Sequence, residues 1–456
     1  MQEKKELNKM GVLPIGRLLA TMSLPAMLSM LILALYNIVD SIFVSRISEE
    51  ALAAVTLAFP AQIIIIALAI GTAIGTNSLI SRRLGSKDFD EADSAATHGL
   101  VLAICNWCIL ALFGIFAGKA FMMFFTDDKY LLENGTVYLR ICCILSFFTF
   151  IQLSIEKILQ ATGNMLFPMI STLTGAVVNI VLDPIMIFGL FGFPRLEVAG
   201  AAIATITGQF CGMTVALLLF FGKKHQVKIK LRGFRFDKDI LKKIYAVGFP
   251  AMLMQVMVSI LVFAINGILI AFSKTAVAFL GIYFRVQSFI FMPVFGLCQG
   301  TMPILGYNYG ARNKDRFMKT FWLAIKVGVF VMALGMALFM IFPREILSAF
   351  DANENMYKLG IPALRIICLC FIPAAFGIIS STMFQSIGKG KYSLFVSLLR
   401  QLILILPIAW LLAEYFGVGA VWWAFPIAET VALIFSTILF RKIYREEIKP
   451  MNINQC

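Results

Sequence analysis

The sequence predicts an all-α polytopic membrane protein of about twelve transmembrane helices, arranged as two six-helix lobes related by a pseudo-twofold axis. Three observations carry this prediction: an apolar composition, basic residues that gather in alternate loops, and an internal repeat at one fixed offset. Hydrophobic residues make up 60% of the 456-residue chain and charged residues only 14%. A soluble domain has roughly 45–50% apolar and about 25% charged residues, so the composition argues against a water-soluble fold.

Apolar runs recur along the whole chain, and many exceed the roughly 20 residues that cross a bilayer as a helix. The helices that these runs predict span residues 18–44, 51–80, 95–117, 137–158, 166–190, 198–222, 245–271, 276–306, 320–342, 361–386, 392–413 and 418–441. No segment longer than a loop is left over for a soluble domain, so the chain is expected to lie almost entirely within the bilayer.

The loops between these runs alternate in charge. One set, which includes both termini and residues 223–243, carries 28 Lys and Arg residues, whereas the opposite set carries 7. Basic loops stay on the cytoplasmic side, so we expect a multi-pass protein of the cytoplasmic (inner) membrane with both termini in the cytoplasm. This topology explains the net charge of +14 without a nucleic-acid partner.

Two halves of the chain are related by an offset of 225 residues. The offset relates Pro25–Leu28 to Pro250–Leu253, Gln62 to Gln287, Gly71 to Gly296, Gly75-Thr76 to Gly300-Thr301, Gly85 to Gly310, Leu139–Ile141 to Leu364–Ile366, Gln160 to Gln385 and Gly163 to Gly388. We therefore predict an N-lobe over 1–222, a basic cytoplasmic linker over 223–243 and a C-lobe over 244–456. The Gly-x-x-x-Gly pairs predict close helix packing.

Two acidic residues within apolar runs mark the first candidate site. Asp40 and Asp183 lie near the outer ends of the first and fifth predicted helices, at similar depth. Tyr36 and Asn179 each lie one turn away on the same helix face, and Thr205 enters the sixth helix to a comparable depth. Carboxylate, amide and hydroxyl oxygens suit a proton or a hard cation such as Na⁺. The alternative is that each acid caps a helix or faces a watery vestibule.

Other polar residues in the apolar runs are candidates for a substrate cavity or a gate, because ionisable groups in the membrane are costly and usually functional. Arg285 lies in the middle of the eighth helix, with Gln287 close by, and Glu429 lies in the twelfth. Glu156 and Lys157 are expected to form an interfacial pair or a gate. Pro184 disfavours helix at Asp183 and frees a carbonyl below it, unless it only kinks the helix.

No sequence feature indicates an enzyme or a cofactor. The chain has no Walker loop, no H-E-x-x-H and no nucleophile elbow with a triad. Cys105 and Cys108 form a C-x-x-C without a histidine or a second pair, which does not indicate zinc. Energy for transport is therefore not expected from nucleotide hydrolysis by this chain.

Together these residues resemble the multidrug and toxic compound extrusion (MATE) family over approximately 15–445. The resemblance rests on SLPAMLSMLILALYNIVDSIFV, on GxxxGTNSLISRRLG and its repeat GLCQGTMPILGYNYGA, and on LQATGN, NIVLDPIMIFG and VAGAAIAT. It implies a V-shaped exporter driven by inward H⁺ or Na⁺ flow. It also implies that Asp40, Asp183, Asn179 and Thr205 bind the coupling ion, with Tyr36 beside them. Asn266 and Arg285 stand where some members carry acidic C-lobe sites.

The sequence thus predicts a secondary antiporter that exports small organic, cationic or amphipathic multidrug compounds in exchange for H⁺ or Na⁺. We expect a monomer in the lipid bilayer, with no cofactor besides the coupling ion. The main alternative is a flippase or exporter of a lipid-linked or polymeric substrate, for which a strongly cationic central cavity is expected and only Arg285 is a candidate. A membrane-embedded enzyme is a third possibility, but it would need a convergent catalytic set that the sequence lacks.

Overall fold

The computed structural model describes residues 8–44, 49–192, 194, 196–350 and 352–451, without the side chains of 37–44, 49–59, 130, 134, 197 and 198. These residues form helices and turns and no strand. Twelve helical spans among them are long and apolar enough to cross a membrane. The predicted all-α polytopic fold is therefore confirmed, and the protein is a multi-pass membrane protein.

The first half of the chain forms six spans. A short helix, α1, precedes them, and two of the spans consist of more than one helical segment. The helices are α1 (Lys9–Val12), α2 (Ile15–Val44), α3 (Glu49–Gly85), α4 (Phe89–Leu112), a π-helical turn (Phe113–Ala117), α5 (Gly118–Met123), α6 (Lys129–Leu145), α7 (Phe147–Ala161), α8 (Leu166–Phe188), a 3-10 turn (Leu190–Gly192) and α9 (Glu197–Phe221).

The second half repeats this pattern of six spans. Its helices are α10 (Lys238–Ile270), α11 (Lys274–Gly310), α12 (Lys314–Ile341), α13 (Pro343–Ser348), α14 (Glu354–Ile367), a 3-10 turn (Cys368–Cys370), α15 (Phe371–Ser386), α16 (Gly390–Leu398), a π-helical turn (Leu399–Leu404), α17 (Ile405–Phe416), a 3-10 turn (Val418–Trp423), α18 (Ala424–Ile443) and a π-helical turn (Tyr444–Ile448).

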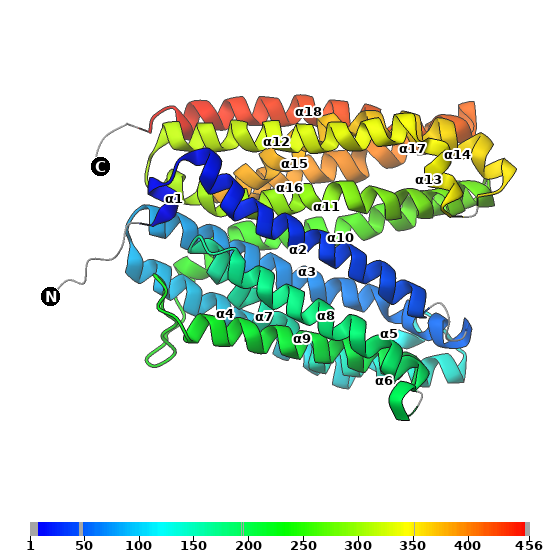
Figure 1. Cartoon of the computed structure of the whole chain (residues 1–456), viewed down its shortest axis with the longest axis horizontal. Helices are drawn as coiled ribbons and strands as arrows, with labels where there is room; N and C mark the ends of the chain where they lie inside the picture. The colour runs from blue at the N-terminus through cyan, green and yellow to red at the C-terminus, as the bar shows by residue number, and fades with distance from the viewer. Residues whose placement is uncertain (1–7, 45–48, 193, 195, 351, 452–456) are drawn as a thin grey trace.

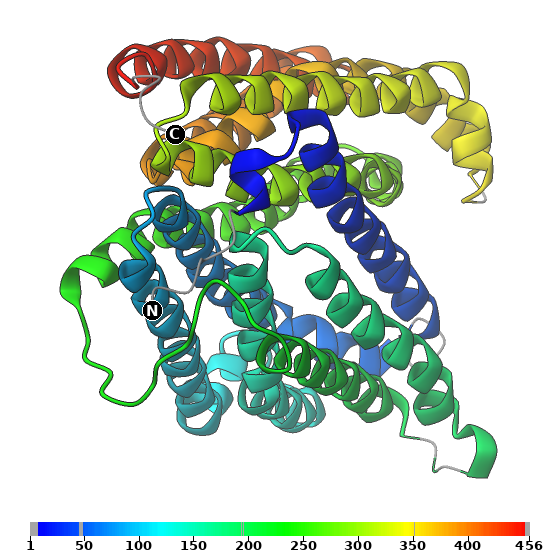
Figure 2. The same cartoon turned by 60° about the vertical axis from the view of Figure 1, so that its left-hand side comes forward.

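The two lobes meet at one end of the molecule and diverge toward the other, which gives the predicted V shape (Figures 1 and 2). We call the end near Asn8 and Met451 the terminal end and the opposite end the distal end. Two pairs of helices cross between the lobes: α3 packs on α10, and α2 packs on α11. A helix pair from each lobe thus holds the V together.

Repeat-related glycines line this contact between the lobes. A Cβ on Gly75 of α3 would collide with the Ile244 carbonyl of α10, and a Cβ on Gly300 of α11 would lie 2.7 Å from Ser23 Cα of α2. Gly71 and Gly296 approach the same partner helices one turn away. The absence of side chains lets the backbones touch, so the packing role predicted for the Gly-x-x-x-Gly pairs is confirmed.

The repeat also extends to backbone geometry. Lys87 and Arg312, which the 225-residue offset relates, both have positive φ angles, of 61° and 53°. Each is followed by a residue, Asp88 or Asn313, whose side chain caps the next helix. Equivalent residues therefore build the same tight turn in each half.

Several helices extend beyond the apolar runs at the terminal end, so some predicted boundaries are wrong. The third, seventh and ninth spans begin at Phe89, Lys238 and Lys314 rather than near 95, 245 and 320. An Asp or Asn precedes each start and accepts a backbone N–H. The cap decides where a helix begins, whereas the apolar run marks only its membrane-embedded part.

The structure also corrects the assignment of residues 388–400. Their basic residues were counted with the cytoplasmic loops. Helix α16 begins at Gly390, and Arg400 lies in the π-helical turn that joins α16 to α17. Arg400 is therefore a membrane-span residue and not a loop residue. Its side chain has a buried partner, described below.

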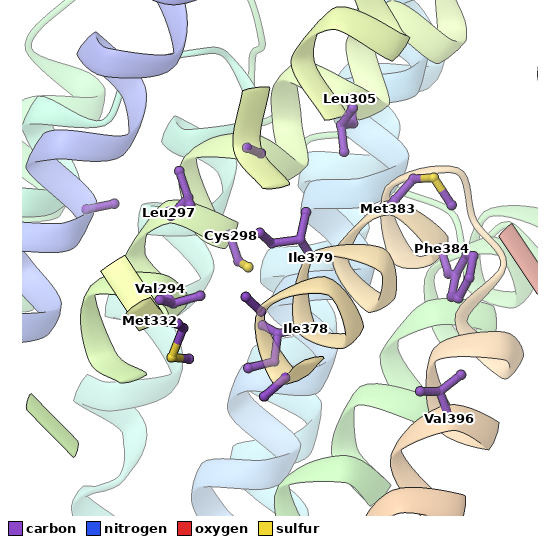
Figure 3. Packing of buried hydrophobic residues seen from close by; sticks show 14 of the residues in the cluster. Val294, Leu297, Cys298, Leu305, Met332, Ile378, Ile379, Met383, Phe384 and Val396 are labelled. Carbon is purple, nitrogen blue, oxygen red and sulfur yellow. The ribbon is translucent and has the colours of Figure 1, made fainter. Parts of the chain in front are cut away.

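The C-lobe has a continuous apolar core. Val294, Leu297 and Cys298 of α11 pack with Ile378 and Ile379 of α15 (Figure 3). All five are at most 8% exposed. Such close packing makes each lobe suited to move as a unit.

Candidate ion-coupling and substrate sites

A small polar cluster lies between α8 and α9 in the N-lobe. Asn179 and Asp183 are 3% and 0% exposed, and Asn179 Nδ2 donates to Asp183 Oδ1 at 3.4 Å and to Thr205 Oγ1 at 3.2 Å. Asp183 lies five residues before the distal end of α8, about 7.5 Å along the helix. The structure thus brings together three residues that the sequence predicted to share a site.

Glycines hold α8 and α9 close enough for this contact. A Cβ on Gly208 of α9 would lie 2.6 Å from the Gly175 carbonyl oxygen of α8 and 3.1 Å from Asn179 Cβ. Near the distal end, a Cβ on Gly200 would lie 2.5 Å from the Met186 carbonyl oxygen. Asn179 can therefore reach across to a short side chain such as Thr205.

Pro184 does not interrupt the helix that carries this cluster, contrary to the expectation from sequence. Helix α8 runs without a break from Leu166 to Phe188, where Gly189 ends it with a φ of 73°. Proline lacks an N–H, so the carbonyl of Ile180 has no intrahelical donor. Asn179 Oδ1 is also buried without a hydrogen-bond partner among the described residues. Two oxygens next to Asp183 are therefore available to a bound cation.

The other members of the predicted ion site lie on α2. Helix α2 packs beside α8 and carries Tyr36, which is half-buried. Asp40 lies in the same helix, but its side chain is outside the described residues. Tyr36 and Asp183 each take part in a further interaction. Within the described side chains no three His, Cys, Asp or Glu residues gather as a metal site, so a cation here would also need amide, hydroxyl or carbonyl oxygens.

Two of the C-lobe candidates face the N-lobe across the V. Arg285 is exposed and precedes Gly296 by eleven residues, which is close to three full turns. It therefore lies on the side of α11 that packs on α2 further along. Asn266 follows Gly248 by eighteen residues, or five turns, on the side of α10 that touches α3. Both residues therefore lie on helices that join the lobes, on the sides that meet the N-lobe nearer the terminal end.

Gln287 lies on another side of the same helix. It is within about 20° of Val294 around α11, and Val294 is fully buried. Gln287 is half-buried and therefore faces the interior of the C-lobe. It is not on the side of Arg285.

The expectation of an interfacial Glu156–Lys157 pair is wrong. Glu156 is 5% exposed, and its Oε1 accepts from Gln152, Ser171 and Thr172 at 3.0, 2.8 and 3.1 Å. Lys157 Nζ instead donates to Gln299 across the lobe boundary at 2.9 Å. Adjacent residues on a helix point about 100° apart, so the two side chains find different partners.

Glu429 has a partner that the sequence analysis did not identify. Its Oε1 lies 3.2 Å from Arg400 Nη1, and the two side chains are 11% and 16% exposed. Arg400 went unnoticed because it was counted with a basic loop. The signal that marks it is the run of apolar residues on both sides, VSLLRQLIL.

Sequence reasoning also missed the polar contacts that join the lobes at the terminal end. Ser78 Oγ donates to the Gln385 carbonyl at 2.6 Å, and Gln299 accepts from Lys157 and from Gln160 at 2.9 and 3.3 Å. We call these residues the interlobe latch. Gln160 and Gln385 are repeat-related, which is a signal in the sequence, but Ser78 and Gln299 have no such mark.

Comparison with known proteins agrees with this geometry. The profile of the MatE family matches residues 25–185 and again residues 250–411. The chain belongs to the MATE family of multidrug efflux transporters. The two matched segments are again about 225 residues apart, as in the repeat.

Relatives of known sequence and structure cover most of the chain. The multidrug export protein MepA of Staphylococcus saprophyticus is 25% identical over 418 residues, 91% of each chain. A multidrug resistance MATE family transporter of the MOP superfamily, solved in an outward-facing conformation, is 29% identical with a TM-score of 0.91, covering 97% of this chain and 98% of that one. A MOP superfamily transporter from Pyrococcus furiosus has a TM-score of 0.89 at 30% identity, covers 97% of this chain and 98% of that one, and is described as having a binding pocket of reverse polarity that suggests a different function.

Membership of the MATE family makes this protein a transporter.

Proposed function

We propose that this MATE protein is a secondary antiporter that exports small organic compounds, cationic or neutral, in exchange for H⁺ or Na⁺. The observation that carries the proposal is the fully buried Asp183, held with Asn179 and Thr205 inside the N-lobe. A carboxyl group at this depth in a membrane protein is costly, and such groups usually mark an ion pathway.

The N-lobe cluster supports exchange between an inorganic cation and an organic one. A proton on Asp183, or Na⁺ bound by its oxygens, would neutralise the pocket and remove its attraction for a cationic substrate. The two ligands would then oppose each other through one site. The names of the curated relatives, multidrug export proteins, support an organic substrate.

Orientation in the membrane follows from charge. We propose that the terminal end faces the cytoplasm, because 27 basic residues, with Arg400 left out of the original 28, lie in loops or at helix ends on that side and 7 on the other. The protein would then be a monomer of the cytoplasmic membrane with both termini inside, divided into an N-lobe (1–222), a linker (223–243) and a C-lobe (244–456). The latch at the terminal end would close the cytoplasmic side, so this conformation would open outward.

Pro25 supplies a point at which α2 can bend during the cycle. Helix α2 packs tightly on α11 on both sides of Pro25, through Ser23 with Gly300 and through Met27 with Gly296, and it also packs beside α8. Proline removes one intrahelical hydrogen bond, which lowers the cost of a bend. We propose that ion binding in the N-lobe moves the distal part of α2, narrows the lobe and expels the substrate outward.

Transport in proteoliposomes tests the proposal. Vesicles with a clamped membrane potential should take up a fluorescent organic cation when an outward gradient of H⁺ or of Na⁺ is imposed, and the substrate should in turn drive that ion. The ion that supports both directions is the coupling ion. Equal rates with and without either gradient would contradict the proposal.

A further inference from the structure

The C-lobe contains a buried charge pair with no counterpart in the proposed N-lobe mechanism. Glu429 of α18 and Arg400 of the π-helical turn at Leu399–Leu404 approach within 3.2 Å. In Figure 1, α18 runs the length of the C-lobe, and it packs on α15, α16 and α17. π-helical turns occur mostly as single bulges, frequently at functional sites, and this one holds the arginine.

The repeat places this pair on the helices that correspond to those of the N-lobe cluster. The 225-residue offset relates α8 and α9 to the helices on either side of the C-lobe pair: Thr205 corresponds to Thr430, next to Glu429, and Gly175 corresponds to Arg400. The same helix pair therefore carries ionisable chemistry in both lobes, with different residues.

Polar groups around the pair are buried without partners. Tyr283 Oη, Trp422 Nε1 and Gln401 Oε1 have no hydrogen-bond partner among the described residues. Tyr283 and Trp422 are 0% and 1% exposed. Buried donors and acceptors are normally satisfied, and ordered water satisfies those that protein groups leave open. Trp422 lies in the 3-10 turn Val418–Trp423 that precedes α18, seven residues before Glu429, so water that entered from the distal end past Trp422 would satisfy these groups along a path to Glu429.

Aromatic rings enclose the path. The Tyr283 ring lies 6.1 Å from Phe425, one turn before Glu429, and Trp422 packs edge-on against Phe279 at 5.0 Å. The titratable groups that interact with Glu429 are Arg400 from the π-helical turn, Tyr283 from α11 and Cys370 from the turn before α15.

We propose that Glu429 is a second proton-exchange site of this exporter, in the C-lobe, with Arg400 as its counter-ion. The carboxylate takes one proton from water on the distal side and becomes a neutral acid. It returns that proton to water on the cytoplasmic side in the inward-open state, so one proton crosses and no other bond changes. The inference rests on the proposed antiport and adds a second site to it.

The arginine needs other acceptors while Glu429 is neutral, because an unpaired buried cation is costly. Gln401 Oε1, buried in the same π-helical turn without a described partner, is a candidate acceptor. A π-helical turn also shifts backbone carbonyls out of their regular pattern. The pair can therefore open and close without leaving a charge unsolvated.

The test compares the gradients that wild type and Glu429→Gln sustain in proteoliposomes with the membrane potential clamped at zero. Loss of one coupled proton should lower the steady drug gradient about tenfold per pH unit. The exposed Glu414→Gln on α17 is the matched control and should keep the wild-type gradient. Because Glu429→Gln leaves Arg400 unpaired, the double variant Arg400→Gln/Glu429→Gln should also be measured; it should fold and show the same loss.

The outcomes separate the two proposals. If wild type exchanges drug for neither H⁺ nor Na⁺, the proposed function fails. If wild type couples to H⁺ and both Glu429 variants keep its gradient and pH profile, the pair is structural and this inference is overturned. Coupling of wild type to Na⁺ alone overturns the inference and leaves the antiport intact.

Discussion

The N-lobe and the C-lobe use the same pair of helices to carry different chemistry. Between α8 and α9, the position equivalent to Arg400 is Gly175, and the backbones touch so that Asn179 reaches Thr205. Between the equivalent helices of the C-lobe, an arginine and a glutamate replace the glycine and an alanine. One pocket presents a carboxyl, an amide and a hydroxyl; the other presents a balanced ion pair.

The comparison shows that the two halves share one arrangement of helices but carry different polar side chains at equivalent positions. A carboxyl with neutral neighbours attracts any cation that reaches it, whereas a carboxylate already paired with arginine releases its partner only when protonated. We therefore expect the N-lobe to be the site where ion and substrate compete, and the C-lobe pair to respond to protons alone.

The largest effect is expected from Asp183→Asn. Asparagine is neutral and similar in size, so it mimics the protonated pocket and cannot exchange an ion. Coupled drug export should fall to the level of empty vesicles, while the protein still folds and binds drug. Transport rates, together with drug affinity across pH 5.5 to 8.5 with and without Na⁺, test this.

Asn179→Ala sharpens the same prediction. It removes the amide that joins Asp183 to Thr205 but leaves the carboxyl, so weakened but surviving coupling is expected. Wild-type export by Asp183→Asn would show that the N-lobe cluster is structural. The proposal that ion and substrate compete in the N-lobe would then be contradicted.

The glycines between the lobes should give the next largest effect. Gly75→Ala and Gly300→Ala each place a methyl group against backbone of the other lobe, and overpacking typically costs about 1–3 kcal/mol. Since the contact exists only where the lobes close, both variants should lower the thermal midpoint and slow export. The two variants should show losses of similar size, because Gly75 and Gly300 are related by the repeat.

Gly281→Ala and Gly267→Ala are matched controls for these variants. They lie on α11 and α10, and a Cβ at either position meets nothing within 4 Å. Their midpoints and export rates should stay at the wild-type level or rise slightly, since alanine favours helix by roughly 1 kcal/mol over glycine. Equal losses in all four variants would mean that helix flexibility, not the interlobe contact, is what matters.

The interlobe latch should have a smaller effect, on conformational populations. Lys157→Gln weakens a hydrogen bond from a charged donor, worth about 1.5–3 kcal/mol, and should raise the fraction of molecules open at the terminal end by roughly tenfold or more. Spin labels at Ser86, after α3, and Lys242, in the first turns of α10, both exposed, can report this by their distance distribution. The exposed Lys326→Gln should leave the distribution unchanged, and an unchanged distribution in Lys157→Gln would refute the latch.

The smallest effect is expected in the linker, whose backbone N–H groups are bonded to side chains of the N-lobe helix α4. Lys228 N–H donates to Asp93 Oδ1 at 2.8 Å, and Lys230 Nζ lies 3.0 Å from Asp93 Oδ2. Asp93→Asn should raise amide exchange of the linker modestly, because a surface ion pair contributes about 0–1 kcal/mol. Lys224→Gln is the control, and equal exchange in both variants would show that the pair does not hold the linker.

The stabilisation that the Asp93–Lys230 pair gives the linker should not depend on pH between 6 and 9. The hydrogen bond with Asp93 raises the pKa of Lys230, so its contribution is fully present below the unfolded lysine value of about 10.4 and is lost only as pH rises through the higher folded pKa. Linker exchange, corrected for intrinsic rates, should be flat across that range.

The sequence by itself determined the membrane fold and its repeat, and it predicted three neighbouring residues of the candidate ion site. Apolar runs, basic loops and the 225-residue offset are each local or periodic signals, and the bilayer allows few other solutions for such a chain. Asn179 and Asp183 could be grouped because they lie one turn apart on one helix. Helix ends were less certain, since caps such as Asp88 and Asp237 lie outside the apolar pattern.

Only the tertiary structure decided which side chains meet across helices. Nothing in the sequence near Glu156 or Lys157 says that one turns into the N-lobe while the other crosses to Gln299. Likewise Arg400 and Glu429 are far apart in the chain and belong to helices that pack together only in the folded lobe. The rotation of each helix about its axis depends on packing with several neighbours at once, and it is this rotation that pairs a buried charge with its partner.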